Sequence, residues 1–319
     1  MRTIWSNVLK TTLTLGAIVY LVVVVEPSAV ATAFAEVRWP AVAAAALLRP
    51  LSLGLEVRMW RGLLRPVAPH VASRRLWRAV LSGFALAFVT PARVGEFAGR
   101  ALSLPGADPW AVGLTVFVQR VVDTTVNVLA GTGALVVLLA TGALDASAAW
   151  WTLAGVGGGV GVLLLGGLTC PRGVAGLVDR LLPHRTSVRG RVALLRAYTP
   201  REIARALGWA VLRYGVFCTQ FLLLLYAFAP DLPLGSAVLA VTLTFFVKFL
   251  APSITLMDLG IQEGAAVFFL GLFGVAQAVA FNAALVLFLI TIVVPTAAGV
   301  PFVWRLRFAR ADAPSPTRS

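Results

Sequence analysis

The chain has 319 residues, of which 59% are hydrophobic and 13% are charged, so it is too apolar for a water-soluble domain of this length. Its formal net charge of +14 could suggest a nucleic-acid-binding protein. The basic residues, however, stand in short connections between apolar runs, which is typical of membrane topology signals. We therefore expect an all-α, multi-pass membrane bundle that binds no nucleic acid.

Six apolar segments are long enough to cross the membrane, because a helix needs about 20 residues to span about 30 Å of hydrocarbon. The first is interpreted as a retained helix and not as a cleaved signal peptide, since Val25-Glu26-Pro27 is a poor cleavage site. The predicted full spans cover about residues 8–27, 39–57, 109–140, 149–169, 203–229 and 276–304.

Two other apolar regions are interrupted and predict re-entrant helical hairpins. The stretch between Arg78 and Arg93 is too short to cross and is closed by Thr90-Pro91, which predicts a hairpin over 79–104. Lys248, Pro252 and the polar stretch 257–260 divide the region 235–275 into two half-segments. The sequence thus predicts eight hydrophobic segments, of which six are full spans.

The distribution of Lys and Arg predicts the orientation of the chain. Most of the 27 basic residues fall in 1–10, 58–78, 172–205 and the tail, so both termini are expected in the cytoplasm, with the protein in the cell (inner) membrane. All nine tryptophans fall at or near predicted segment ends, where indole rings prefer the membrane interface. Residues 172–201 are either an amphipathic helix on the inner leaflet or an ordinary basic loop. The last residues, 311–319, are expected to be a disordered tail.

The order of the segments predicts an inverted repeat within one integral membrane domain, residues 1–310. One unit covers about 39–140 and the other about 203–304, each with a span, a hairpin and a span. The two hairpins would open to opposite sides of the membrane. Inverted repeats with broken helices place the binding site of many transporters near the midplane, so this organisation indicates transport.

Ionisable side chains within the apolar segments are the candidate functional residues, because each is costly at membrane depth unless it is paired or hydrated. Glu96 is spaced to meet both Arg93 and Arg100 on one helix face, and Arg120, Asp123 and Asn127 form a polar stripe. These charges either only pair helices together or leave a cation available to an anion such as a phosphate. The basic set is Arg49, Arg93, Arg100, Arg120, Arg213 and Lys248, and the acidic set is Glu56, Glu96, Asp123, Asp258 and Glu263. The candidate substrate-binding residues are Arg93, Glu96, Arg100, Arg120 and Asp123 on the cytoplasmic side, with Lys248, Asp258 and Glu263 as their counterparts outside.

No metal site, cofactor or catalytic residue is predicted. His70 and His184 stand apart in predicted loops, and Cys170 and Cys218 are too scattered for a metal site or a disulfide framework. The hydroxyl residues Ser82, Thr90 and Ser253 have no neighbouring base that would make a nucleophile.

Three motifs together resemble the transmembrane region of the lysylphosphatidylglycerol synthase family, and the resemblance covers nearly the whole chain. They are Pro91-Ala92-Arg93-Val94-Gly95-Glu96 with Arg100, Gln119-Arg120-Val121-Val122-Asp123, and Leu259-Gly260-Ile261-Gln262-Glu263-Gly264-Ala265. The region is also found in the flippase domain of the multiple peptide resistance factor and in archaeal dolichol-linked glycosylation proteins. The family pattern usually has glycine, glutamate and arginine where this chain has Ala92, Gln119 and Gln262.

The resemblance implies a flippase-like translocase that moves an anionic, aminoacylated or polyprenyl-linked lipid between leaflets. The family's synthase activity belongs to a separate soluble domain, so no aminoacyl transfer is expected from this chain. Two other hypotheses stay open. The chain could be an accessory subunit or membrane-embedded transferase in lipid-linked glycan or phospholipid modification, with a glycosyltransferase or aminoacyl-transferase as partner, or it could be a scaffold whose charges only pair helices.

Overall fold

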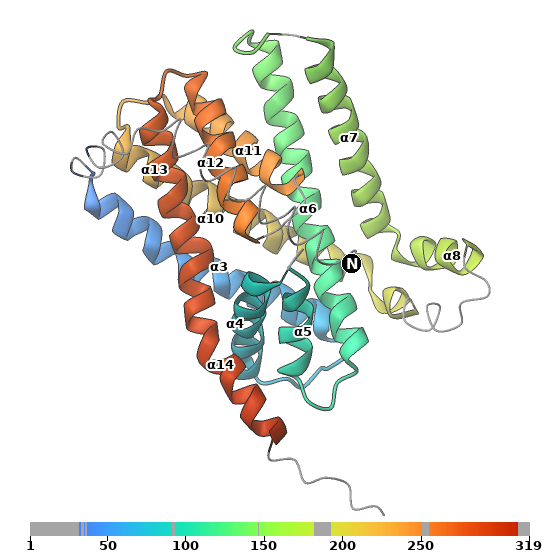
Figure 1. Cartoon of the computed structure of the whole chain (residues 1–319). Coiled ribbons are helices and arrows are strands. Elements are labelled where there is room, and N and C mark those ends of the chain that lie inside the picture. Colours follow the sequence, from blue (N-terminus) through green and yellow to red (C-terminus); the bar gives the residue numbers. More distant parts are fainter. Residues whose placement is uncertain are drawn as a thin grey trace, which may run out of the picture.

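The computed structural model describes residues 32, 35, 37–90, 93–145, 147–181, 193–250 and 255–311, and the side chains at 178, 181, 255–259 and 305–311 lie outside that description. Within these ranges every regular element is a helix (Figure 1). The span predicted over 8–27 and nearly all of the predicted tail, 312–319, lie outside the described residues. The all-α prediction is confirmed for the part of the chain that the structure describes.

Five helices are long and apolar enough to cross a membrane, which confirms five of the predicted apolar segments. They are α3 (Trp39–Leu64), α6 (Pro109–Ala140), α7 (Ala148–Thr169), α10 (Pro200–Phe228) and the continuous run of α13 (Gln277–Phe288), η3 (Leu289–Val293) and α14 (Val294–Ala311). Helix α3 continues seven residues beyond its predicted end at residue 57. The apolar run ends at Arg58, but Met59, Leu63 and Leu64 are buried, so tertiary packing carries the helix further.

Two pairs of shorter helices occupy the interrupted regions. The first pair is α4 (Ser73–Val89) with α5 (Val94–Leu102), and the second is α11 (Leu234–Leu250) with α12 (Thr255–Gly271). Helix α4 ends at Val89 and α5 begins at Val94, on either side of Pro91; α11 ends at Leu250 and α12 begins at Thr255, on either side of Pro252, and both prolines lie outside the described residues. Lys248 and the polar stretch 257–260 lie within α11 and α12, so the prediction that they also interrupt the region is wrong. Proline disfavours a helical conformation at the residue before it and offers no backbone N–H, which accounts for the position of the breaks.

Small residues allow α5 to pack directly on the backbone of α4. Gly95 and Gly99 are four residues apart on one face of α5, and a Cβ atom at Gly99 would lie 2.7 Å from the carbonyl oxygen of Ser82. A Cβ atom at Gly95 would collide with the carbonyl oxygen of Leu86. This spacing of small residues is a common way for membrane helices to approach closely.

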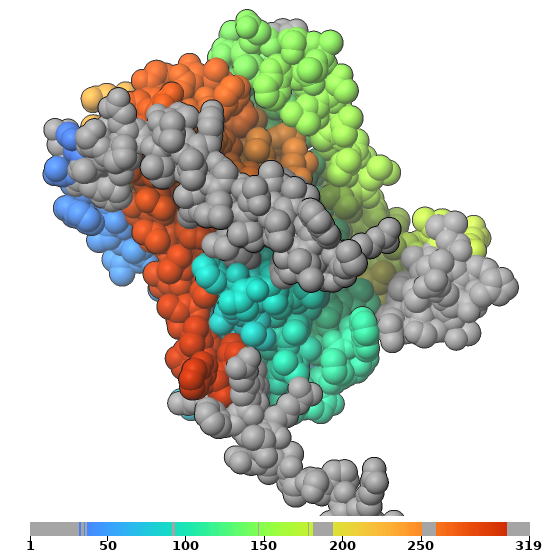
Figure 2. Space-filling model, viewed as in Figure 1, coloured from blue at the N-terminus to red at the C-terminus, as the bar shows by residue number. Residues whose placement is uncertain are grey.

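The helices pack in a bundle in which sequence-distant segments lie together. Helix α3 packs along α10, α14 along α4, and α6 along α7 (Figure 1). In the space-filling view the green helices α6 and α7 form one edge, and the orange-to-red run from α13 to α14 descends along the opposite side (Figure 2).

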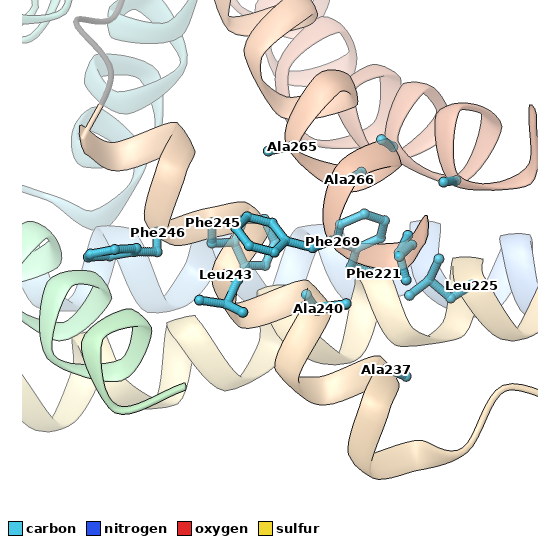
Figure 3. Close-up of a cluster of buried hydrophobic side chains, with 14 of the residues drawn as sticks. Phe221, Leu225, Ala237, Ala240, Leu243, Phe245, Phe246, Ala265, Ala266 and Phe269 are labelled. Carbon is cyan, nitrogen blue, oxygen red and sulfur yellow. The ribbon is translucent and has the colours of Figure 1, made fainter. Parts of the chain in front are cut away.

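The largest apolar core lies between α10, α11 and α12. Phe221, Phe245 and Phe269 extend toward one another from these three helices, and the ring centroids of Phe221 and Phe245 are 5.8 Å apart (Figure 3). On α11, the neighbouring Phe246 occupies the space beside Gly131 of α6 and Gly157 of α7. The aromatic side chains of α11 therefore pack against α6 and α7 as well as against α10.

The basic segment predicted over 172–201 is partly helical. Helix α8 (Pro171–Leu181) turns sideways from the end of α7, and the short helix η2 (Ala193–Ala197) follows (Figure 1). An ion pair between Asp179 and Arg196 joins these two elements. Next to η2, the buried Tyr198 hydroxyl donates to the carbonyl oxygen of Leu63 at 2.7 Å, and burial raises the pKa of this phenol.

Trp60 is buried against the protein and does not face outward as an interfacial indole would. Its side chain is fully buried, and Nε1 donates to Thr115 Oγ1 at 2.9 Å. Trp60 lies in the last part of α3, four residues before its end at Leu64. A buried indole needs an acceptor for its N–H, and Thr115 provides one.

Candidate functional site

A continuous network of buried ion pairs joins α3, α5, α6 and α10. Arg100 on α5 donates through Nη2 to Glu56 Oε1 and to Glu96 Oε1, at 2.6 Å in each case. Arg213 on α10 donates to Glu56 Oε2 at 3.1 Å and forms an ion pair with Asp123 Oδ2 at 2.5 Å. Glu56 and Asp123 are thus neutralised by arginines from other helices, and Glu96 by Arg100 of its own helix and Arg120 of α6.

Glu96 is the acid on which the first helix pair is anchored. Its Oε1 atom accepts from Arg100, and its Oε2 atom accepts from Arg120 of α6. Arg93 Nε lies 4.0 Å from Oε2. The side chain is almost completely buried, so removing one of its partners would leave the carboxylate with less compensating positive charge in a medium of low polarity.

A cavity of about 100 Å³ lies against this network and is bordered by both broken helix pairs. Arg93 comes from the break between α4 and α5, Lys248 from the end of α11, and Thr291 from η3. The η3 element is a π-helical turn within an otherwise α-helical run, an irregularity that is frequent at functional sites. The cavity is therefore bordered by residues next to both helix breaks and by the π-helical turn. Its charged lining consists of Arg49, Glu56, Arg93, Arg120, Asp123, Arg213 and Lys248, and its aromatic lining of Phe84, Tyr214, Phe217, Phe245 and Phe249.

The backbone at Arg93 is held in a conformation that is unusual for a side-chain-bearing residue. Its φ of 54° and ψ of 25° fall in the left-handed region. Thr90 stabilises the break, since its Oγ1 accepts from the N–H of Gly95 at 2.7 Å and donates to the carbonyl oxygen of Leu86 at 2.8 Å. Strained backbone that the surroundings hold in place is common at binding sites, and here it directs Arg93 to the cavity.

Arg49 is a buried cation that forms no direct ion pair with an acid among the described residues. Its guanidinium lies 5.2 Å from the ring centroid of Phe84 and 5.7 Å from that of Phe217. Its closest polar contact is a long hydrogen bond of 3.4 Å from Nη1 to Ser52 Oγ, and Nε has no hydrogen-bond partner. Aromatic faces compensate a cation only partly, so Arg49 keeps its capacity to bind an anion in the cavity.

The candidate residues of the second helix pair fall in different places. Lys248 lies on the same cavity as Arg93, and its Nζ donates to Gln262 Oε1. Glu263 is fully buried and is not among the residues that line the cavity. The side chain of Asp258, in the first turn of α12, lies outside the described residues.

Gln119 and Gln262, the two departures from the family pattern in the described residues, each accept a hydrogen bond from a cationic side chain, the buried Arg100 and the partly buried Lys248. Gln119 Oε1 accepts from Arg100 Nη1 at 2.8 Å. Gln262 Oε1 accepts from Lys248, while its Nε2 donates to the carbonyl oxygen of Ala284 at 3.1 Å. An arginine at position 262 could not accept from Lys248, so the glutamine suits the lysine that faces it.

The structure brings together Arg93, Glu96, Arg100, Arg120 and Asp123, and it adds four residues that were not among the candidate substrate-binding residues: Arg49, Glu56, Gln119 and Arg213. Their only sequence signal is a polar group inside an apolar run. Within the described ranges no three His, Cys, Asp or Glu side chains lie together as a set that could hold a metal ion.

The apolar helices and the buried charges define a multi-pass helical membrane protein with a charged interior cavity. The family model described as lysylphosphatidylglycerol synthase TM region matches residues 7–299, so the chain belongs to this family. Comparisons with curated proteins and with solved structures each gave no match.

Proposed function

We propose that the protein is a flippase-like lipid translocase whose charged cavity binds the headgroup of an anionic, aminoacylated or polyprenyl-linked lipid. The observation that carries the proposal is the position of Arg49, a buried cation on the cavity that forms no direct ion pair in the described part of the chain. A phosphate would supply the missing anion and would accept hydrogen bonds from the guanidinium. Membership of the family is consistent with such a role.

The proposed topology has six full spans and two re-entrant hairpins, α4–α5 and α11–α12, with both termini in the cytoplasm of the cell (inner) membrane. In this proposal the units of about 39–140 and 203–304 form an inverted repeat. Each contains a long helix, a broken helix pair and a second long run, which is the order that an inverted repeat requires. The contribution of both breaks to one cavity supports access to the cavity from either side of the membrane.

The size of the cavity favours a small anionic group as its occupant. About 100 Å³ is enough for a phosphate-sized group and too little for a whole lipid, since pockets for drug-sized ligands measure about 300–1,000 Å³. The acyl or polyprenyl chain would therefore stay among the helices or in the bilayer while the headgroup is bound.

The proposal is tested by reconstituting the purified protein into liposomes that contain fluorescent phosphatidylglycerol, lysylphosphatidylglycerol or polyprenyl phosphate. Leaflet exchange is followed by adding a membrane-impermeant quencher. We expect faster exchange of at least one lipid than in protein-free liposomes. Equal rates for all three lipids with and without protein would refute translocation.

Replacing Arg49 with Gln separates binding of a headgroup from stabilisation of the fold. Arg49 has no ion-pair partner among the described residues, so Arg49→Gln removes the cost of a buried charge and should not lower the melting temperature. Exchange should fall about tenfold or more, since a charge-assisted hydrogen bond to the phosphate is lost. A variant that melts like the wild type and exchanges lipid at the wild-type rate would exclude Arg49 from the binding site.

Two outcomes of the same preparation would favour the alternative hypotheses. A covalently altered lipid, detected by mass spectrometry after incubation with the purified protein, would favour a membrane-embedded transferase. Co-purification with a glycosyltransferase or aminoacyl-transferase, together with no lipid exchange, would favour an accessory subunit. We propose that the chain itself carries out no aminoacyl transfer.

A further inference from the structure

A second and larger hollow lies on the other side of α3, between this helix, the start of α4 and the start of α10. Its volume is about 850 Å³. Arg49 and Glu56 are seven residues apart and face the charged cavity, whereas Gly54, Arg58 and Arg61 line this second hollow. At about 100° per residue along a helix, these two sets lie on opposite faces of α3. We refer to the second hollow as the α3 groove.

One end of the α3 groove is strongly basic. Arg58, Arg61 and Arg65 follow one another at spacings of three and four residues along α3, and Arg205 of α10 adds a fourth guanidinium. Glu202 is the acid among the described lining residues, and its Oε2 already accepts from the backbone N–H of Thr199 at 2.9 Å and from its hydroxyl at 3.0 Å. The positive charge of this end therefore exceeds the negative charge.

The other end of the α3 groove is apolar, and two indole rings stand between the ends. Leu51 and Leu55 line the apolar end, and Trp77 and Trp209 line the groove next to the arginines. The guanidinium of Arg58 lies 5.9 Å from the ring centroid of Trp209. Tryptophan prefers the boundary between headgroups and hydrocarbon, so the rings mark the depth at which a lipid would change from polar to apolar.

The length of the α3 groove matches one leaflet of a bilayer. From residue 50 to residue 65, α3 rises about 22 Å at about 1.5 Å per residue. One leaflet with its headgroup layer is about 20–22 Å thick, which is half of a bilayer of about 40–45 Å. An occupant of this groove would have a negative group at one end and a hydrocarbon chain at the other.

We propose that the α3 groove is a binding site for an anionic glycerophospholipid from the leaflet on the arginine side. The phosphate binds to Arg65 and Arg205 at the mouth, and one acyl chain lies along Leu51 and Leu55. The basic end of the groove complements the negative charge of such a lipid, and the length of the groove matches one leaflet. Because the groove is separated from the charged cavity by α3, this site is a second lipid site, and occupancy at equilibrium does not require that the protein translocates lipid.

The test uses the full chain in phosphatidylcholine vesicles with a small fraction of phosphatidylglycerol that carries a photoreactive diazirine in its acyl chain. After illumination, labelled peptides are mapped by mass spectrometry. We expect labelling within residues 50–59 that excess unlabelled phosphatidylglycerol suppresses and excess phosphatidylcholine does not. Glycerol 3-phosphate in the buffer should not suppress it, since that molecule has no acyl chain.

The matched variants are two pairs of exposed arginines. Arg65→Gln with Arg205→Gln removes two charges from the groove, whereas Arg75→Gln with Arg180→Gln removes two charges that do not line it. The groove pair should lower the labelling of residues 50–59 about tenfold or more, and the control pair should leave it at the wild-type level. Melting temperatures of all variants are measured to confirm equal folding.

Three results would overturn the proposal. One is an equal fall in the labelling of residues 50–59 in the groove pair and in the control pair, because that would reflect only the overall charge of the protein. A second is equal competition by phosphatidylcholine, or full suppression by glycerol 3-phosphate. The third is a high-yield disulfide between cysteines introduced at Leu51 and along residues 8–27, in a variant whose native cysteines are replaced by serine. Such a disulfide would show that the chain's own N-terminal segment fills the groove.

Discussion

Replacing Glu56 with Gln tests whether the buried network holds the helices around the cavity. The carboxylate accepts from Arg100 at 2.6 Å and from Arg213 at 3.1 Å, and it is almost completely buried. Removing one partner of a buried ion pair costs about 3–5 kcal/mol, and glutamine recovers part of that because its carbonyl oxygen still accepts from one guanidinium. We expect a loss of about 3 kcal/mol in the free energy of unfolding.

A loss of this size corresponds to a fall of roughly 6–9 °C in melting temperature, at about 2–3 °C per kcal/mol for a chain of this length. The assay is thermal unfolding of the detergent-solubilised protein, followed by intrinsic tryptophan fluorescence. The control is Asp231→Asn, which neutralises an exposed acid between α10 and α11 and should shift the melting temperature by about 1 °C or less. If Glu56→Gln unfolds at the same temperature as this control, Glu56 does not anchor the network.

A double-mutant cycle with Arg100 strengthens this test. Arg100→Met alone leaves Glu56 and Glu96 with one cation fewer, so it should be at least as damaging as Glu56→Gln. The double variant should be more stable than the sum of the two losses predicts, by about 1–3 kcal/mol, because each single change already breaks the shared pair. Additive losses would mean that the two side chains are not energetically coupled.

Two further substitutions probe the packing of the helix pairs. Gly99→Ala should lower the melting temperature, because its Cβ atom would lie 2.7 Å from the carbonyl oxygen of Ser82. The control, Gly133→Ala, has no atom within 4 Å of its added Cβ and should be neutral or stabilising. Equal melting temperatures of the two variants would contradict the close packing of α4 and α5. Gln262→Arg should destabilise the protein by about 1–3 kcal/mol, because it places a second cation against Lys248. Adding Lys248→Gln to Gln262→Arg should restore the melting temperature. If the double variant is as unstable as Gln262→Arg alone, residues 248 and 262 are not in direct contact.

The positions of the breaks explain why the membrane helices could be located before any tertiary information. The apolar runs of α6 and α7 are bounded by turn residues, and the prediction for α6 agrees with the structure at both ends. Thr90-Pro91 marks the first break because a proline ring is incompatible with the helix that precedes it. These are local effects, in which a few consecutive residues determine the backbone that they adopt.

Which side chains pair with one another in the charged network could be decided only from the tertiary structure. Glu56 and Arg213 are 157 residues apart, and either could have paired with several other charges in the apolar segments. The burial of Trp60 depended likewise on packing against α6, although its position near a predicted helix end suggested an interfacial residue. Arg49 was visible as a charge in an apolar run, but its place between two aromatic rings came from α4 and α10.

The sequence alone determined that the described part of this membrane protein is all-α, that its helices are interrupted around Pro91 and Pro252, and which residue types carry charge within the apolar segments. It could do so because hydrophobicity and the conformational limits of proline act over neighbouring residues. Only the tertiary structure decided that Arg93 and Lys248 border one cavity and that Arg49 faces it without a direct ion pair among the described residues. The physical reason is that an ion pair depends on the relative rotation and distance of whole helices, which packing between distant segments fixes.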